Sequence, residues 1–65
     1  MTQGQLNQLF QQARRNSIAI QRSAGASQMF GDDTVAVVVS GSDVRWHLND
    51  RRIAWDRLQS MCDDY

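Results

Sequence analysis

The side chains best suited to chemistry lie in one stretch of the sequence, VRWHLNDRRIAWDRL at 44–58. It contains both tryptophans, the only histidine and four of the seven arginines. Arginine makes planar, two-bonded contacts with carboxylates and phosphates, and exposed tryptophans can stack on nucleic-acid bases. The stretch therefore indicates either a surface that binds a partner or a hairpin and helix that pack the tryptophans into a core.

Groups that could perform catalysis or hold a metal are scarce. One histidine and one cysteine, His47 and Cys62, are too few for a zinc site within one chain. No serine lies in a G-x-S-x-G elbow, and no glycine-rich phosphate loop is present. The sequence thus predicts a protein that is not an enzyme, with no catalytic residue, no metal site and no cofactor.

Composition is typical of a small globular protein. The 65 residues are enough for a single domain, 1–65, with a thin core. All seven bases are arginine and all seven acids are aspartate, so the net charge is zero and the broad attraction to nucleic acid is missing. A lone cysteine suggests a reducing compartment, and the longest apolar run, VAVVV at 35–39, is too short to span a membrane. We expect a cytoplasmic protein without a membrane segment.

The first half of the chain predicts a helix followed by a strand. An apolar stripe typical of an amphipathic helix runs over residues 4–15. It consists of Leu6, Leu9, Phe10 and Ala13. Ile18 and Ile20 then alternate with small or polar residues, so residues 17–22 are interpreted as a half-buried strand, followed by a loop over 23–33. The alternative is a first helix that continues toward Met29.

Two predicted turns set the register of the second half. Gly41-Ser42 and Asn49-Asp50 are each interpreted as a two-residue hairpin turn, because glycine, asparagine and aspartate tolerate positive φ. The two turns independently place every large apolar side chain except Val38 on the same face of one sheet. The predicted cross-strand pairs are Val39–Val44, Val37–Trp46, Val35–Leu48, Trp46–Ile53 and Val44–Trp55. The predicted strands cover 34–40, 43–48 and 51–54, and a C-terminal helix covers about 55–63.

These elements predict an α+β domain of two layers. An antiparallel sheet of three or four strands carries the N- and C-terminal helices on one face, in the order α-β-β-β-(β)-α. Trp46 and Trp55 are assigned to the buried face, because so small a chain needs its largest apolar groups in the core.

The other face of the sheet is left uncovered. Small apolar residues ringed by arginine and histidine make it a candidate contact patch. The candidate partner-binding residues are Arg45, His47, Arg52, Val38, Ala36 and Arg51. The alternative for this face is the ordinary solvated side of an antiparallel sheet.

The first functional hypothesis is a small non-enzymatic protein-interaction module. Its partner would be a larger protein, or a protein–nucleic acid assembly, whose activity it modulates. The scarcity of catalytic groups, the neutral charge balance and the uncovered sheet face favour this hypothesis. Proteins of this size and style are common in phages and other mobile elements as inhibitors or regulators, and the analogy suggests such a role here.

The second hypothesis is a nucleic-acid-binding module. In the order and length of its elements the chain resembles the double-stranded-RNA-binding domain. The resemblance implies phosphate contacts from the start of the last helix, where Arg51, Arg52 and Arg57 stand in place of that family's lysines beside Asp56. It also implies a contact from the first β–β loop, which here ends in Asp32-Asp33. These acidic residues favour a protein partner over nucleic acid.

Self-association is the third hypothesis, and it is compatible with either of the others. The edge strand near residues 17–22, or the patch around Ala36 and Val38, would form a two-fold interface. A homodimer of this kind would add buried area to a thin core.

Overall fold

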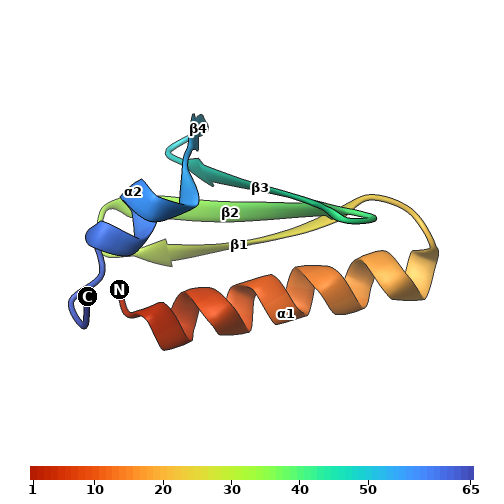
Figure 1. Cartoon of the computed structure of the whole chain (residues 1–65), viewed down its shortest axis with the longest axis horizontal. Coiled ribbons are helices and arrows are strands. Elements are labelled where there is room, and N and C mark those ends of the chain that lie inside the picture. Colours follow the sequence, from red (N-terminus) through yellow and green to blue (C-terminus); the bar gives the residue numbers. More distant parts are fainter.

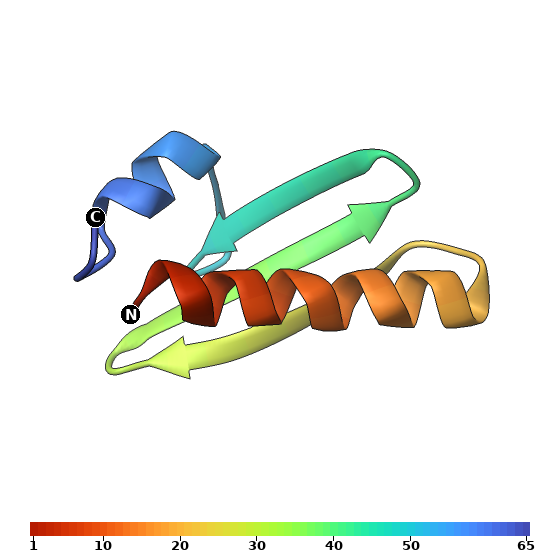
Figure 2. The same ribbon diagram turned by 60° about the horizontal axis from the view of Figure 1, so that its bottom comes forward.

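The elements follow one another along the chain as a helix, four antiparallel strands and a short second helix. A computed structural model describes all residues, 1–65. Its elements are α1 (Gln3–Ile20), β1 (Ala24–Phe30), β2 (Asp33–Ser40), β3 (Asp43–Leu48), β4 (Arg51–Ile53) and α2 (Trp55–Ser60). The strands form one sheet in the order β1-β2-β3-β4, and α1 packs on one of its faces (Figure 1, Figure 2). The predicted α+β fold class is confirmed.

A capping box begins α1. The Thr2 hydroxyl accepts a hydrogen bond from the Gln5 N–H (3.2 Å), and the Gln5 side chain accepts one from the Thr2 N–H (2.9 Å). Two N–H groups at the helix start are thereby satisfied. The helix ends before Gln21, whose φ of 54° is left-handed. At 18 residues, α1 is longer than the predicted helix over 4–15.

The strand predicted at 17–22 is wrong, because these residues form the last part of α1 and the turn that follows it. Ile18 and Ile20 are 66% and 54% exposed, so their alternation does not reflect a half-buried strand. Extending an existing helix gains a hydrogen bond for each residue added, whereas a new element must be started afresh. The helix therefore continues through Asn16 and Ser17, beyond the predicted end at residue 15.

The first strand lies instead at Ala24–Phe30, inside the predicted loop over 23–33. Its residues, AGASQMF, have little intrinsic preference for a strand. Pairing with β2 overrides this weak preference, since β1 matches β2 residue by residue from Ala24↔Val39 to Phe30↔Asp33. Gly25 suits the close approach, because a Cβ at that position would lie 3.0 Å from the Val37 carbonyl oxygen.

The predicted register of the two hairpins is confirmed within the sheet. The observed pairs include Val35↔Leu48, Val37↔Trp46, Val39↔Val44 and Trp46↔Ile53. Gly41 has a φ of 61° in the first turn, and Asn49 and Asp50 have φ of 51° and 68° in the second. Positive φ thus occurs at residue types that tolerate it in two-residue hairpin turns.

The end of the sheet differs from the prediction. β4 stops at Ile53, and Trp55 is the first residue of α2 rather than a strand residue. The predicted sheet pair of Val44 with Trp55 is therefore wrong. α2 ends at Ser60, short of the predicted 63, although Cys62 beyond it is buried in the core.

The core lies between the helices and the sheet. Its nine buried residues are Leu6, Leu9, Ala13, Val35, Val37, Val39, Trp46, Leu58 and Cys62. Trp46 belongs to it as predicted, being 8% exposed, whereas Trp55 is 38% exposed. The two indole rings pack together with their centroids 5.0 Å apart and their planes tilted by 32°. The assignment of Trp55 to the core thus holds only in part.

Candidate functional site

Five of the six predicted site residues share the sheet face opposite α1, which we call the open face. Ala36 lies across from His47, and His47 lies across from Arg52. Val38 lies across from Arg45 in the next row of the same face. The sixth predicted residue, Arg51, pairs with Leu48 and therefore projects to the other side of the sheet. The structure thus brings together all of the predicted patch except Arg51.

The open face continues onto β1, which was not part of the predicted patch. Gly25 pairs with Val38, and Ser27 pairs with Ala36. Met29 pairs with Thr34 and is 67% exposed. These residues were missed because AGASQMF carries no strand signal of its own.

The edge of β3 is only half covered. β4 ends at Ile53, opposite Trp46, so residues 43–45 have no strand beside them on that side. In the β2–β3 hairpin, Ser40 and Asp43 flank the two-residue turn as a hydrogen-bonded pair, and the pattern repeats at every second residue. The N–H and C=O of Val44 therefore point away from β2 with no ladder partner.

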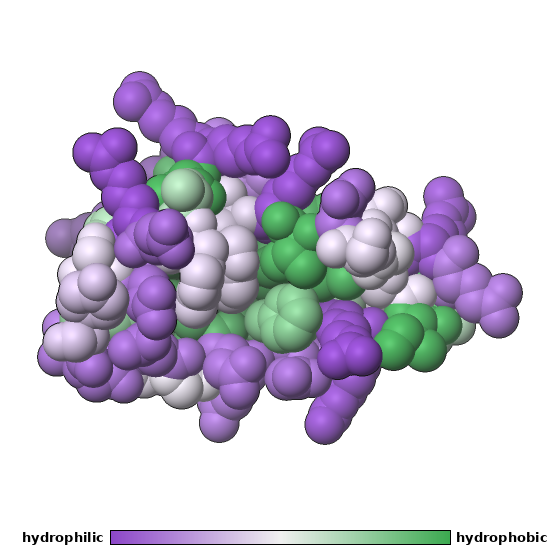
Figure 3. Space-filling view, in the orientation of Figure 1, coloured by the Kyte–Doolittle hydropathy of each residue, from purple (hydrophilic) through white to green (hydrophobic).

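An apolar groove lies directly beside this free edge. It has a volume of about 760 Å³ and runs between α1, β3 and the start of α2. Its apolar lining residues are Phe10, Val44, Trp46, Ile53, Ala54 and Trp55. We call this the aromatic groove. Figure 3 shows apolar side chains in green between the sheet and α1 on this side of the molecule. Val44 and Trp55 are 39% and 38% exposed there, so the groove presents apolar surface that the small core has not covered.

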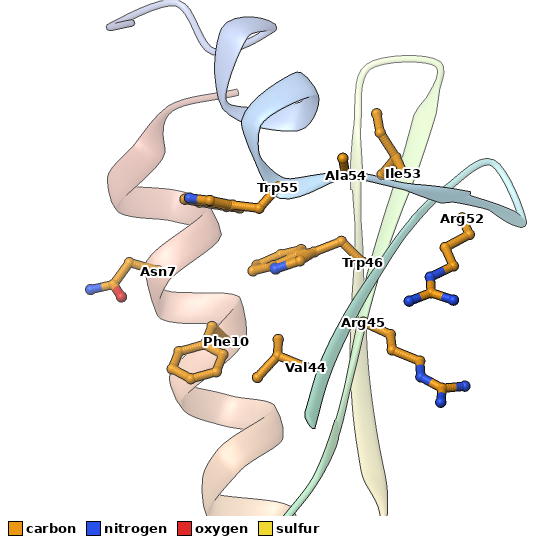
Figure 4. Close-up of a pocket in the computed structure, with 9 residues that line it drawn as sticks. All are labelled: Asn7, Phe10, Val44, Arg45, Trp46, Arg52, Ile53, Ala54 and Trp55. Carbon is orange, nitrogen blue, oxygen red and sulfur yellow. The ribbon is translucent and has the colours of Figure 1, made fainter. Parts of the chain in front are cut away.

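Two arginines border the aromatic groove. Figure 4 shows Phe10, Val44 and the two indoles on one side of β3, with the Arg45 and Arg52 side chains on the other. Neither guanidinium forms an ion pair, since the one salt bridge of the chain joins the Met1 amino group to Asp63 (3.0 Å). Arg45 and Arg52 therefore connect the aromatic groove with the open face and keep their charges available.

A second, more polar hollow lies beside β4. It is lined by three arginines, Arg51, Arg52 and Arg57, together with Asn49 and the chain from Ile53 to Ala54. The resemblance to the double-stranded-RNA-binding domain implied these same arginines for phosphate contacts. The structure brings them together around a single hollow.

The remaining reactive group, Cys62, is not exposed for chemistry. Burial raises the pKa of the Cys62 thiol, and the nearby Asp64 carboxylate raises it further. A thiol that stays protonated is a poor nucleophile and a poor metal ligand. No three histidine, cysteine or acidic side chains gather where they could hold a metal ion, and neither helix combines the length and apolar composition of a membrane span.

Sequence reasoning missed the aromatic groove. Trp55 was assigned to the core, and Val44 to a pair that does not form. Trp55 is exposed because β4 ends early, and no local sequence pattern predicts where β4 ends. Comparison of the chain with protein-family models, with curated proteins and with solved structures gave no match.

Proposed function

We propose that this chain is a small non-enzymatic protein-interaction module that binds an extended segment of a larger protein along the free edge of β3. The observation that carries the proposal is the unpaired backbone of Val44, with the aromatic groove on one side and two unpaired arginines on the other. Strand addition at a sheet edge is a common mode of peptide recognition, in which backbone hydrogen bonds give affinity and alternate side chains give specificity.

The geometry of the edge defines the chemistry of the bound segment. Successive side chains of a strand point to opposite faces of the sheet. In a segment beside Val44, one set of side chains would enter the aromatic groove against Phe10 and Trp55. The alternate set would meet Arg45 and Arg52 on the open face, where carboxylates suit guanidinium groups. The expected ligand is an extended peptide that alternates large apolar and acidic residues.

Such binding would make the chain a regulator or inhibitor of its partner, as phage and mobile-element proteins of this size often are. A module that holds a segment of a larger protein, or of a protein–nucleic acid assembly, can block or reposition that segment without performing chemistry. The scarcity of catalytic groups in the sequence supports this role.

Nucleic-acid binding is the second candidate, and the polar hollow beside β4 favours it. Arg51, Arg52 and Arg57 line that hollow together, and clustered arginines bind phosphates well. Zero net charge opposes it, because there is no broad field to attract a polyanion.

A peptide-array screen tests the first candidate. The full chain is applied to an array of random extended peptides, and we expect enrichment of sequences that alternate large apolar and acidic residues. The double variant Arg45→Ala/Arg52→Ala should lose this binding while its melting temperature stays nearly unchanged, because both side chains are exposed and unpaired. The matched control is Arg14→Ala/Arg15→Ala, which removes the same charge from exposed positions of α1. Equal loss in both double variants would refute a specific site.

Binding to fluorescent single- and double-stranded DNA and RNA, measured at low salt and as salt rises, decides between the candidates. Tight binding with a steep salt dependence would establish the nucleic-acid function, because displaced counterions oppose phosphate binding. Arg51→Ala/Arg57→Ala should then abolish that binding. If nucleic acid does not bind even at low salt, where charges are least screened, the protein partner stands.

A further inference from the structure

We propose that β1 is a dimerisation strand. Two copies of this chain would pair their β1 strands antiparallel, about a two-fold axis at Ser27, and so join their sheets into one. This inference is independent of the proposed function, because β1 and the free part of β3 lie on opposite edges of the sheet.

The outer edge of β1 offers a complete row of unpaired backbone groups. Phe30 and Asp33 flank a two-residue turn as a hydrogen-bonded pair, and the pattern repeats along the ladder. The N–H and C=O groups of Gly25, Ser27 and Met29 therefore point away from β2. β1 is the last strand of the sheet on this side, and Figure 2 shows α1 in front of the sheet rather than beyond its β1 edge.

The two edges of the sheet differ in the protection they carry. β4 has three residues, two of them arginine, and a short charged edge discourages pairing. β1 has seven residues, AGASQMF, with no charged residue and no proline. Its register with β2 is uninterrupted, so no bulge twists it away. Of the two outermost strands, β1 and β4, only β1 lacks the usual devices against strand addition.

The side chains of two antiparallel copies of β1 would be complementary in size. Antiparallel pairing centred on Ser27 would place each large side chain opposite a small one: Met29 opposite the partner's Gly25, Gln28 opposite the partner's Ala26, and Phe30 opposite the partner's Ala24. Ser27 would face the partner's Ser27. This pattern argues for a second copy of the chain. The first three residues of β1 are small and the last three are large, and a copy that runs in the opposite direction matches this order, whereas an unrelated strand has no reason to match it.

The largest of these contacts would cover surface that is now exposed. Met29 is 67% exposed on the open face. Gly25 has no side chain, and the point where its Cβ would stand is 3.5 Å from a methyl group of Val38. Met29 would thus lie over the partner's Gly25 and pack against the partner's Val38. The open-face patch at Val38, predicted from the sequence as a self-association surface, would then form part of the interface together with β1.

The flank of α1 that would meet the second copy is mostly uncharged. α1 lies over β1 and β2 in Figure 2, so the two α1 helices would be neighbours across the axis. Asn7 and Phe10 mark the flank of α1 that faces the aromatic groove. Helical periodicity assigns Gln5, Gln12 and Asn16 to the opposite flank, which faces the outer side of β1. These three side chains are uncharged amides, and Arg15 lies beside them, since it lines the same surface hollow as Gln12 and Asn16.

Sedimentation equilibrium over a range of concentrations tests the proposal. The wild-type mass should rise from monomer to dimer with concentration. Ser27→Lys and Ser27→Asp should each lose the dimer, because the two-fold axis places like charges directly opposite one another. An equimolar mixture of these two variants should regain a dimer that contains one copy of each. Gln11→Lys, a matched charge change on the exposed outer face of α1, should dimerise as the wild type does.

Three results would overturn the proposal: a wild-type monomer at every concentration, a dimer of Ser27→Lys, or a mixture of the two folded variants that stays monomeric. Circular dichroism establishes that the variants are folded. If either is unfolded, Met29→Ala replaces them, and it must weaken the dimer because it removes the side chain that covers the partner's Gly25. Arg45→Ala/Arg52→Ala should dimerise normally, so failure of the dimer and failure of the peptide site are distinguishable.

Discussion

Asn49 joins the β3–β4 turn to the start of β2, and its replacement gives a quantitative test of the fold. Its side-chain oxygen accepts a hydrogen bond from the Thr34 N–H (2.9 Å), and its side-chain amide donates to the Asp33 carboxylate (3.0 Å). Its φ of 51° is left-handed. The residue thus combines a contact to the start of β2 with a backbone conformation that few side chains adopt.

The two contributions can be separated by two variants. Asn49→Gly removes both hydrogen bonds but adopts positive φ freely, and we expect it to lower the free energy of unfolding by about 1 kcal/mol. Asn49→Ala removes the same bonds and also places an alanine at positive φ, which adds about 1 kcal/mol. The alanine variant should therefore lose about 2 kcal/mol, a large fraction of the roughly 3–10 kcal/mol expected for a chain of this size.

Urea unfolding, followed by tryptophan fluorescence, measures both variants. For a domain this small, 1 kcal/mol corresponds to about 4–8 °C in melting temperature, so the alanine variant should melt about 10 °C below the wild type. Equal losses in the two variants would show that the left-handed backbone at Asn49 carries no cost. A loss below about 0.5 kcal/mol in both would show that the two hydrogen bonds of the Asn49 side chain do not stabilise the fold.

Three further predictions concern the core, the indole pair and the thiol. Leu58→Ala should destabilise the chain by about 2–4 kcal/mol in urea unfolding, because Leu58 is fully buried and anchors α2; Met61→Ala, at a 43% exposed position, should cost far less, and equal costs would contradict this account of α2. Trp55→Ala should cost about 1–2 kcal/mol through loss of packing on Trp46 and should abolish binding of the enriched peptides; intact peptide binding would exclude the aromatic groove. Since burial holds the pKa of Cys62 above that of the unfolded thiol, the contribution of Cys62 to stability is fully present below the unfolded pKa and falls as the pH rises through the folded pKa. Thiol labelling should be slow in the native chain and fast in urea, and a stability that rises with pH over that window would contradict the burial of Cys62.

The C-terminal half of the fold could be predicted because its signals are local and agree with one another. A two-residue turn at Gly41-Ser42 pairs Val37 with Trp46, and another at Asn49-Asp50 pairs Trp46 with Ile53. Both registers therefore place these apolar side chains on one face. A slip of one residue would move every valine of β2 to the other side of the sheet. The grouping of Arg45, His47 and Arg52 on the open face followed from the same alternation.

The first strand could not be predicted, because the reason for it lies elsewhere in the chain. AGASQMF forms β1 through its pairing with β2, whereas SIAIQR, which has the better strand pattern, forms the end of α1 and the turn after it. Tertiary pairing commonly overrides such weak local preferences. Once β1 was assigned to a loop, its free edge and the exposure of Met29 could not be anticipated.

The candidate site, too, was predictable from the sequence only in part. The sequence by itself determined the elements of the hairpins, their register and the residues of the open face from Ala36 to Arg52, since alternation along a strand is a local property. Only the tertiary structure decided that β4 stops at Ile53, that Trp55 begins α2 and is 38% exposed, and that Val44 borders a groove against Phe10. Those features depend on the length over which β3 and β4 pair and on the position where α2 begins. Both are set by packing between segments far apart in the sequence.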